Sequence, residues 1–256
     1  MTIPAGQTRT AGTARIPEQA TASRADQIDA AEIAQIFQRG VTGVPPMQFE
    51  VPANFLPYPM QEDPAERMAA AEEFVRALYK NGDEELWRNA APTIAGMGEI
   101  TASAGIEWAG MAVFDNEQGG VATCTLTLAA TESDHMNPEV ATLALREVLV
   151  RDEFNDSRWL NLPCGPAVSR ITITKFPLDL DVSGGIEGAE LVQGQIQVYI
   201  PFPTGPYMAI MTMQTSNMEV WVEFSQMMAA IVQTIVFPGA PDSNPENASE
   251  AATTSE

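Results

Sequence analysis

The sequence predicts an α+β fold in which an antiparallel sheet of about five or six strands carries helices on its faces, flanked by disordered tails. The first observation is the order of patterns from residue 105: two strands, a helix, three strands and a final helix, with another helix before them. The second is that large apolar residues are concentrated between residues 46 and 238. We therefore expect a single α+β domain over 46–238.

The two tails are expected to be disordered, because burying their few large apolar side chains cannot offset the entropy of ordering them. Residues 1–45 form a leader with one short amphipathic helix, which begins at Ser23 and Asp26 and stops at Gly40. The apolar residues of this helix are Ile28, Ile33, Ile36 and Phe37. Residues 239–256 form an acidic tail rich in Pro, Ser, Asn, Ala and Glu.

The domain opens with an extended segment at residues 47–60, where Phe, Tyr and Val are interleaved with prolines, and we expect it along the domain edge. Asp63 then begins a helix that ends at Gly82. The buried face of that helix holds Met68, Ala71, Phe74, Val75 and Leu78. The residues that follow predict a second, less regular helix that ends near Gly96 or Gly98.

A β-hairpin is predicted next, because apolar residues alternate on both sides of a turn at residues 115–120. Its apolar face holds Ile106, Trp108, Ala112 and Phe114 on the first strand and Cys124, Leu126 and Leu128 on the second. Asn137 and Pro138 then cap a helix. Its apolar face holds Val140, Ala144, Leu145, Val148 and Leu149, with Arg146, Glu147 and Arg151 outward.

Three further strands are predicted at residues 168–176, 194–200 and 207–214. The residues expected to face inward on the first two are Ile171, Ile173, Ile196, Val198 and Ile200. The third strand is apolar on both faces, as a central strand would be. A long helix from Asn217 closes the domain, with apolar residues at helical spacing: Val220, Phe224, Met227, Ile231 and Ile235.

Residues 198–237 resemble the end of PsbP-like α/β/α sandwich proteins. The resemblance lies in a strand, a proline-rich turn at 201–206, a central strand, a Thr-Ser helix cap and a final helix with Trp221. The Phe-Glu-Val-Pro-Ala-Asn-Phe segment at 49–55 resembles the start of actinobacterial members of unknown function. The resemblance implies the sandwich fold and a binding, chaperone-like or assembly-assisting role, and it supplies no catalytic residue.

The chain is strongly acidic, with 13 Lys and Arg against 34 Asp and Glu and a net charge of −21. This charge repels phosphate backbones and anionic headgroups, so we expect a protein partner and neither nucleic acid nor a membrane. The N-terminus shows no basic segment followed by an apolar one, and no run of 18 apolar residues occurs. Two cysteines suit a reducing compartment, so we expect a soluble, cytoplasmic protein.

The sequence lacks the motifs of common catalytic and metal sites. Its one histidine, His135, lies in a loop before a helix cap, and no Gly-x-Ser-x-Gly motif supplies a nucleophile, which favours a solvated loop residue over a catalytic base. With Cys124 and Cys164 forty residues apart, the two cysteines and this histidine do not form a recognisable zinc ligand set. Cys124 is assigned to the core. Cys164 lies in a turn, and its role is left open. We expect no enzyme activity, cofactor or metal.

Residues 179–190 come nearest to a ligand-binding motif. Their oxygen-bearing residues fall at the ligand positions of a calcium loop: Asp179, Asp181, Ser183 and Glu190. Strand-like residues on both sides and the apolar Val182 favour an acidic loop that joins two strands, with calcium binding as the alternative.

Two other patterns have ordinary structural explanations. Six methionines within 21 residues favour core packing over a ligand groove: Met208, Met211, Met213, Met218, Met227 and Met228. Tyr79 and Asp83 match the Tyr-x-x-x-Asp signal of type VII secretion substrates, but the Trp-x-Gly helical hairpin that accompanies this signal is absent. A helix end and a loop are therefore favoured at this point.

We predict a non-enzymatic protein-binding or assembly-assisting protein that contacts its partner through its acidic surface or its N-terminal segment. One alternative is a small-molecule or lipid-binding domain with a cavity under the Met-rich C-terminal helix. Another is a type VII secretion-associated accessory or effector. The identity of the partner and the oligomeric state are left open.

Overall fold

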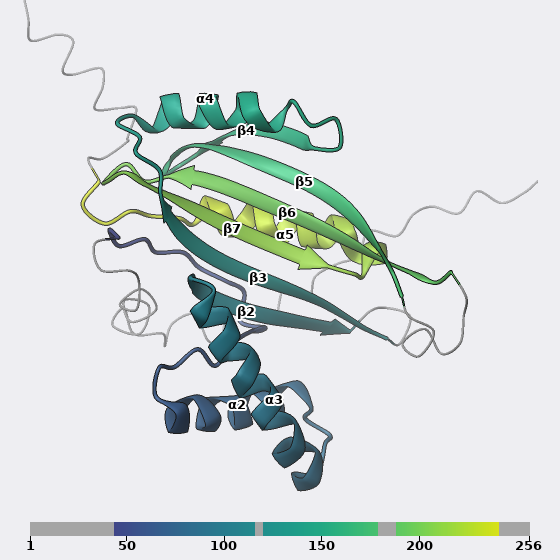
Figure 1. The fold of residues 1–256 in the computed structure, drawn as a ribbon. Helices are drawn as coiled ribbons and strands as arrows, with labels where there is room; N and C mark the ends of the chain where they lie inside the picture. Colours follow the sequence, from purple (N-terminus) through teal and green to yellow (C-terminus); the bar gives the residue numbers. More distant parts are fainter. Residues whose placement is uncertain (1–43, 116–119, 179–187, 241–256) are drawn as a thin grey trace, which may run out of the picture.

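The computed structural model describes residues 44–115, 120–178 and 188–240, and it confirms an α+β fold built on one antiparallel sheet. The sheet has seven strands, one more than the upper end of the prediction (Figure 1). In spatial order they are β1 (Phe55–Pro57), β2 (Ile106–Asp115), β3 (Val121–Glu132), β7 (Tyr207–Thr215), β6 (Glu190–Pro201), β5 (Gly165–Pro177) and β4 (Asp156–Leu162). The predicted extended segment contributes β1 at one edge of the sheet, and the predicted central strand is β7.

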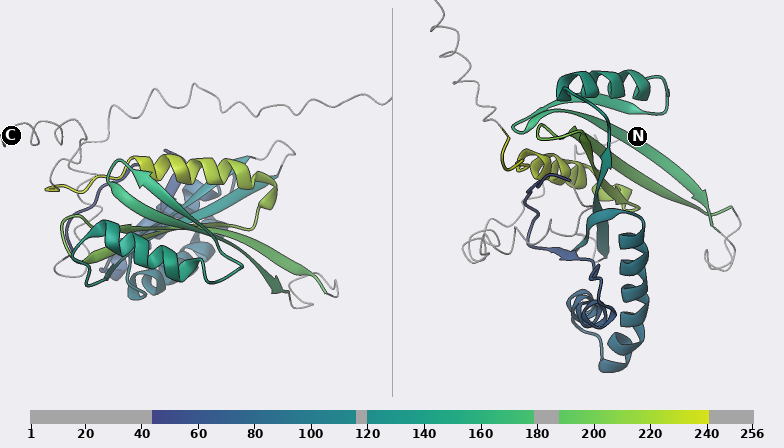
Figure 2. Two further views of the ribbon diagram at one scale, coloured as in Figure 1. Left: turned by 90° about the horizontal axis from the view of Figure 1, so that it is seen from above. Right: turned by 60° about the vertical axis from the view of Figure 1, so that its left-hand side comes forward.

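Helices lie on both faces of this sheet. Helix α5 (Trp221–Gln233) and helix α4 (Pro138–Leu149) are on opposite sides of it (Figure 2, left). Helices α2 (Pro64–Leu78) and α3 (Glu84–Ser103) pack against each other and project beyond the β1–β2 edge (Figure 2, right). Among the described residues, no helix combines the length and apolar character needed to span a bilayer.

The main core lies between the sheet and α5. Strand β3 shows how the sequence builds it, because buried and half-buried residues alternate along the strand. The buried residues are Ala122, Cys124, Leu126 and Leu128, which confirms the predicted hairpin face. The extended N-terminal segment joins this core through Met47, the turn after β6 through Phe202, and the chain after α5 through Phe237.

The α2–α3 pair has its own small apolar cluster around Ala71, Val75, Ala91 and Ala95. Asp63 caps α2 as predicted, by accepting hydrogen bonds from two backbone N–H groups. Helix α3 corrects the prediction, because it continues through both glycines to Ser103. Gly98 does not end the helix but lets it approach the backbone of Pro59.

Three further features differ from the prediction. Strand β4 was not predicted, because an edge strand has only one neighbour and its sequence, Asp-Ser-Arg-Trp-Leu-Asn-Leu, lacks a clean apolar alternation. Ile173 is exposed instead of inward, because β5 and β6 extend past the part of the sheet that is covered. The last helix begins at Trp221, after a short 3-10 turn at Met218–Val220, and ends at Gln233, so Ile235 lies beyond it.

Candidate protein-interaction surface

Helix α4 is held at both ends by polar side chains. At its start, the Asn137 side-chain oxygen accepts hydrogen bonds from the N–H groups of Glu139 (2.8 Å) and Val140 (3.2 Å). At its end, the Asn155 side-chain N–H group donates to the carbonyl of Leu149 at 3.1 Å. Arg170 of β5 donates in turn to Asn155 at 2.7 Å. These bonds fix where the helix begins and ends above the sheet.

The inward face of α4 is centred on Thr142, its one buried residue. The Thr142 hydroxyl donates to the carbonyl of Pro138 at 2.7 Å and lies 3.3 Å from the carbonyl oxygen of Pro166 on β5. Leu145 and Leu149 follow at helical spacing and are half-buried where α4 packs on β5, β6 and β4. The contact of Thr142 with β5 therefore determines which side of α4 faces the sheet.

This orientation corrects the prediction for α4, because three of the five residues assigned to its apolar face are exposed: Val140, Ala144 and Val148. With Leu143 they form the outer face of α4, the name used below for these four residues. Val140 is 63% exposed and Val148 is 59% exposed. Next to this face, Met136 before the helix is 99% exposed and Phe154 after it is 81% exposed. A helix that is apolar on both sides is normally covered on both sides.

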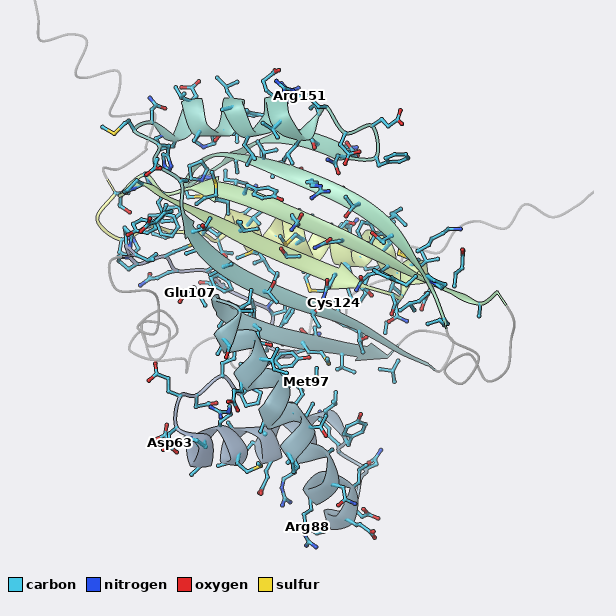
Figure 3. The ribbon with its side chains drawn as sticks, viewed as in Figure 1. Asp63, Arg88, Met97, Glu107, Cys124 and Arg151 are labelled. Atoms are coloured by element: carbon cyan, nitrogen blue, oxygen red, sulfur yellow. The ribbon has the colours of Figure 1, made fainter. Side chains whose placement is uncertain are left out.

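The charge around α4 differs from that of the whole chain. Residues 134–178 contain six acidic and five basic residues, a net charge of −1, against −21 for the chain. Glu139 lies in the first turn of α4 and Arg146 in its last turn, and both are exposed. Arg151 follows at the same end, far from Arg88 near the tip of the α2–α3 pair (Figure 3). The exposed side of α4 thus carries Glu139 in its first turn and both Arg146 and Glu147 in its last turn, around the four apolar residues.

An open depression of about 460 Å³ lies beside the beginning of α4, between the helix and the β4–β5 turn. It is lined by residues that include Pro138, Trp159 and Pro166. The Trp159 indole N–H group donates to the Asn161 side chain at 2.8 Å, which holds the ring in place. The depression supplies a concave border next to the convex outer face of α4.

His135 is not the freely solvated residue that the sequence suggested. It is half-buried and bonded through both ring nitrogens. Its Nε2 lies 3.2 Å from the carbonyl oxygen of Phe202, which can only accept, so Nε2 donates and Nδ1 accepts from the Ser133 hydroxyl. This arrangement ties the loop before α4 to the turn between β6 and β7.

The two cysteines are well separated in the fold. Cys124 is buried in the core as predicted, and Cys164 is half-buried in the β4–β5 turn. Burial raises the pKa of the Cys124 thiol to about 12 and that of Cys164 to about 11. In the described part of the chain, no group of three His, Cys, Asp or Glu side chains is placed to hold a metal ion.

These pKa values predict slow thiol chemistry, because only the thiolate is nucleophilic. At pH 8 we expect both cysteines of the folded protein to resist iodoacetamide. The labelling rate of Cys164 should rise as the pH approaches 11, because its thiolate fraction grows, whereas Cys124 should react only after unfolding in urea. Mass spectrometry of labelled peptides measures both rates. Rapid labelling of Cys124 at pH 8 in the native protein would contradict its burial.

The other candidate residues have structural partners or lie outside the described residues. Met208, Met211, Met213 and Met228 are buried, in line with core packing. Residues 179–187 of the calcium-like pattern lie outside the described residues, and Glu190 at its end pairs with Lys175 at 3.1 Å. Tyr79 is the C-cap of α2 and Asp83 is the N-cap of α3, so the predicted helix end and loop are present at this point. The predicted helix of the leader also lies outside the described residues.

Compared with known proteins, the chain matches no protein-family model and no curated protein sequence. The resemblance to PsbP-like proteins stays a prediction.

Sequence reasoning missed this surface because it placed the apolar residues of α4 toward the core. One signal was present in the sequence, since the apolar residues of 138–149 occupy more than half of the helix circumference. Met136 and Phe154 gave no such signal, because single apolar residues at helix ends are common on protein surfaces.

Proposed function

We propose that this chain is a non-enzymatic protein-binding module that contacts its partner through the outer face of α4. The observation that carries the proposal is the exposure of Val140, Leu143 and Val148 on a helix whose opposite side is already packed on the sheet. Covering such a patch removes apolar surface from water, which favours association by roughly 25 cal/mol per Å² before the costs of binding.

The surroundings of the patch support a protein as the partner. Interfaces typically have an apolar centre and a charged rim, and here Glu139 and Arg146 border the apolar residues. Residues 134–178, which include α4, carry a net charge of −1, so an acidic partner is repelled less by this stretch than by the rest of the chain. The implied binding role of PsbP-like proteins points the same way.

The test is affinity capture from the native host with the full chain and with the double variant Val140→Glu/Val148→Glu. We expect proteins captured by the native chain to be lost, because two carboxylates would have to be buried in the interface. The matched control is Val121→Glu/Val222→Glu, which adds the same charge at valines that are 57% and 61% exposed on β3 and α5. Quantitative mass spectrometry compares the three captures.

All three proteins should unfold at similar temperatures, because the four valines are exposed. If the variant in α4 retains every protein that the control retains, the outer face of α4 is not the binding surface and the proposal fails.

A further inference from the structure

We propose that the edge of strand β4 binds an extended segment of another protein, which adds to the seven-stranded sheet as a further strand. The proposal goes beyond the proposed function, because it concerns backbone groups of the sheet and not the outer face of α4. An unpaired strand edge presents a row of backbone donors and acceptors, and another strand is the ligand that can bond to the whole row.

The two edges of the sheet differ in how they are protected. At one edge, β1 pairs with only three residues of β2, and the segment around it contains Pro52, Pro57 and Pro59. Proline has no backbone N–H group and therefore discourages further pairing. At the other edge, β4 is seven residues long and contains no proline. The edge of β4 is thus the one suited to pair with another strand.

Three residues of β4 turn their backbone groups toward this edge. Leu162 and Gly165 close the β4–β5 hairpin across a two-residue turn, which makes them a hydrogen-bonded pair. Bonded and non-bonded pairs alternate along an antiparallel ladder, so the N–H and C=O groups of Ser157, Trp159 and Asn161 point away from β5. Among the described residues, no backbone group outside β5 bonds to the backbone of β4.

Helix α4 leaves this edge accessible. The helix packs mainly over β5, which is the inner neighbour of β4 in the sheet. Asp156, Arg158 and Asn161 along β4 are exposed, and Phe154 just before the strand is 81% exposed. An extended segment can therefore lie along β4 without displacing the helix.

The depression beside α4 gives this edge a side-chain preference. Trp159 and Asn161 both line it, whereas Leu160 between them packs against the core on the opposite face of the sheet. In an added strand, every second side chain points to the same face as Trp159. Pro138 and Pro166 complete the apolar part of the lining. We therefore expect the bound segment to place an apolar side chain at the depression.

Charge favours a segment of a different protein over β4 of a second copy. Of the described residues that line the depression, Glu139 is the one that carries a charge, and the whole chain carries −21. A second copy would bring the same negative charge to the edge, whereas a neutral or basic segment is not repelled. The ligand is therefore an extended segment with an apolar side chain at the depression and with basic residues in preference to acidic ones.

The test begins with the selection of a probe. A phage-displayed library of random dodecapeptides is selected against the full native chain. We expect the enriched sequences to share one apolar residue, to be poor in Asp and Glu, and to lack proline where they pair with β4. If no sequence is enriched, the edge of β4 does not bind extended segments and the proposal fails.

The decisive variant is Ser157→Pro. It removes one outward N–H group without breaking the β4–β5 ladder, and its ring occupies the edge. We expect it to weaken binding of a synthetic copy of the most enriched peptide by about tenfold or more. Ser157→Ala, the matched control, removes the same hydroxyl but keeps the N–H group, so it should bind within about twofold of the native chain. Calorimetric titration measures the affinities, and thermal unfolding checks that both variants fold.

A measurement on the peptide decides the question if Ser157→Pro does not fold. N-methylation of one backbone amide at a time removes a donor and leaves the side chains unchanged. Only alternate amides of an added strand bond to β4, so methylation should weaken binding by about tenfold or more at every second position and by less than about threefold between them. A loss of affinity without this alternation would overturn strand addition.

Sedimentation of the native chain alone tests the choice of partner. If the native chain dimerises and Ser157→Pro stays monomeric, β4 pairs with itself and the proposed partner is wrong. Val140→Glu/Val148→Glu should still bind the selected peptide, because its β4 backbone is intact. If that variant loses captured proteins while Ser157→Pro binds the peptide as tightly as the native chain, the proposed function stands and strand addition fails.

Discussion

Replacing Phe202 with alanine is expected to lower the free energy of unfolding by about 3–5 kcal/mol. Its side chain is 1% exposed, and its ring packs on Phe237 at a centroid distance of 4.7 Å and on Tyr207 at 6.2 Å. The ring therefore joins the end of β6 to the chain after α5. Alanine would leave a cavity at this junction and would also release Phe237 from its main aromatic contact.

The control is Phe202→Leu, which retains most of the buried volume and should cost less than half as much. Urea denaturation of the native chain and both variants measures the difference. The backbone of Phe202 forms hydrogen bonds with Tyr207 and His135, and these do not depend on its side chain. The loss of unfolding free energy therefore reports on side-chain packing alone. A loss below about 1 kcal/mol for the alanine variant would show that this junction is not part of the cooperative core.

The core of the sheet could be predicted from the sequence. Where one face of the sheet is covered, apolar residues alternate strictly with the residues of the other face. In β3, Cys124, Leu126 and Leu128 alternate with threonines, and all three are buried. A register shift by one residue would expose the entire set, so this pattern leaves a single orientation. A different pattern placed β7 at the centre of the sheet, because its sequence is apolar on both faces.

The orientation of α4 could not be predicted in this way. Its apolar residues fall on two sides of the helix, and each side alone would make an acceptable buried face. The choice depends on the position of Thr142 over the carbonyl of Pro166, a contact between residues 24 apart in sequence. The candidate surface could therefore be identified only from the tertiary packing, which shows which apolar side of α4 is exposed.

Gly98→Ala is expected to destabilise the protein by about 1–3 kcal/mol, although alanine is the better helix former. A Cβ atom at this position would lie 2.8 Å from the carbonyl carbon of Pro59 and closer still to its oxygen. The contact is with backbone, so relief requires α3 to move away from the segment that follows β1. That movement would disturb the packing of the α2–α3 pair on the sheet edge.

Gly96 in the same helix provides the matched control, because a Cβ atom there would meet nothing within 4 Å. Gly96→Ala should therefore stabilise the protein by about 0.5–1 kcal/mol, the ordinary gain in a helix interior. The two identical substitutions, two residues apart, should shift the thermal unfolding midpoint in opposite directions. If both raise it, then α3 does not rest on Pro59, and the α2–α3 pair is held to the sheet by its other contacts, such as the packing of Tyr58 on Phe74.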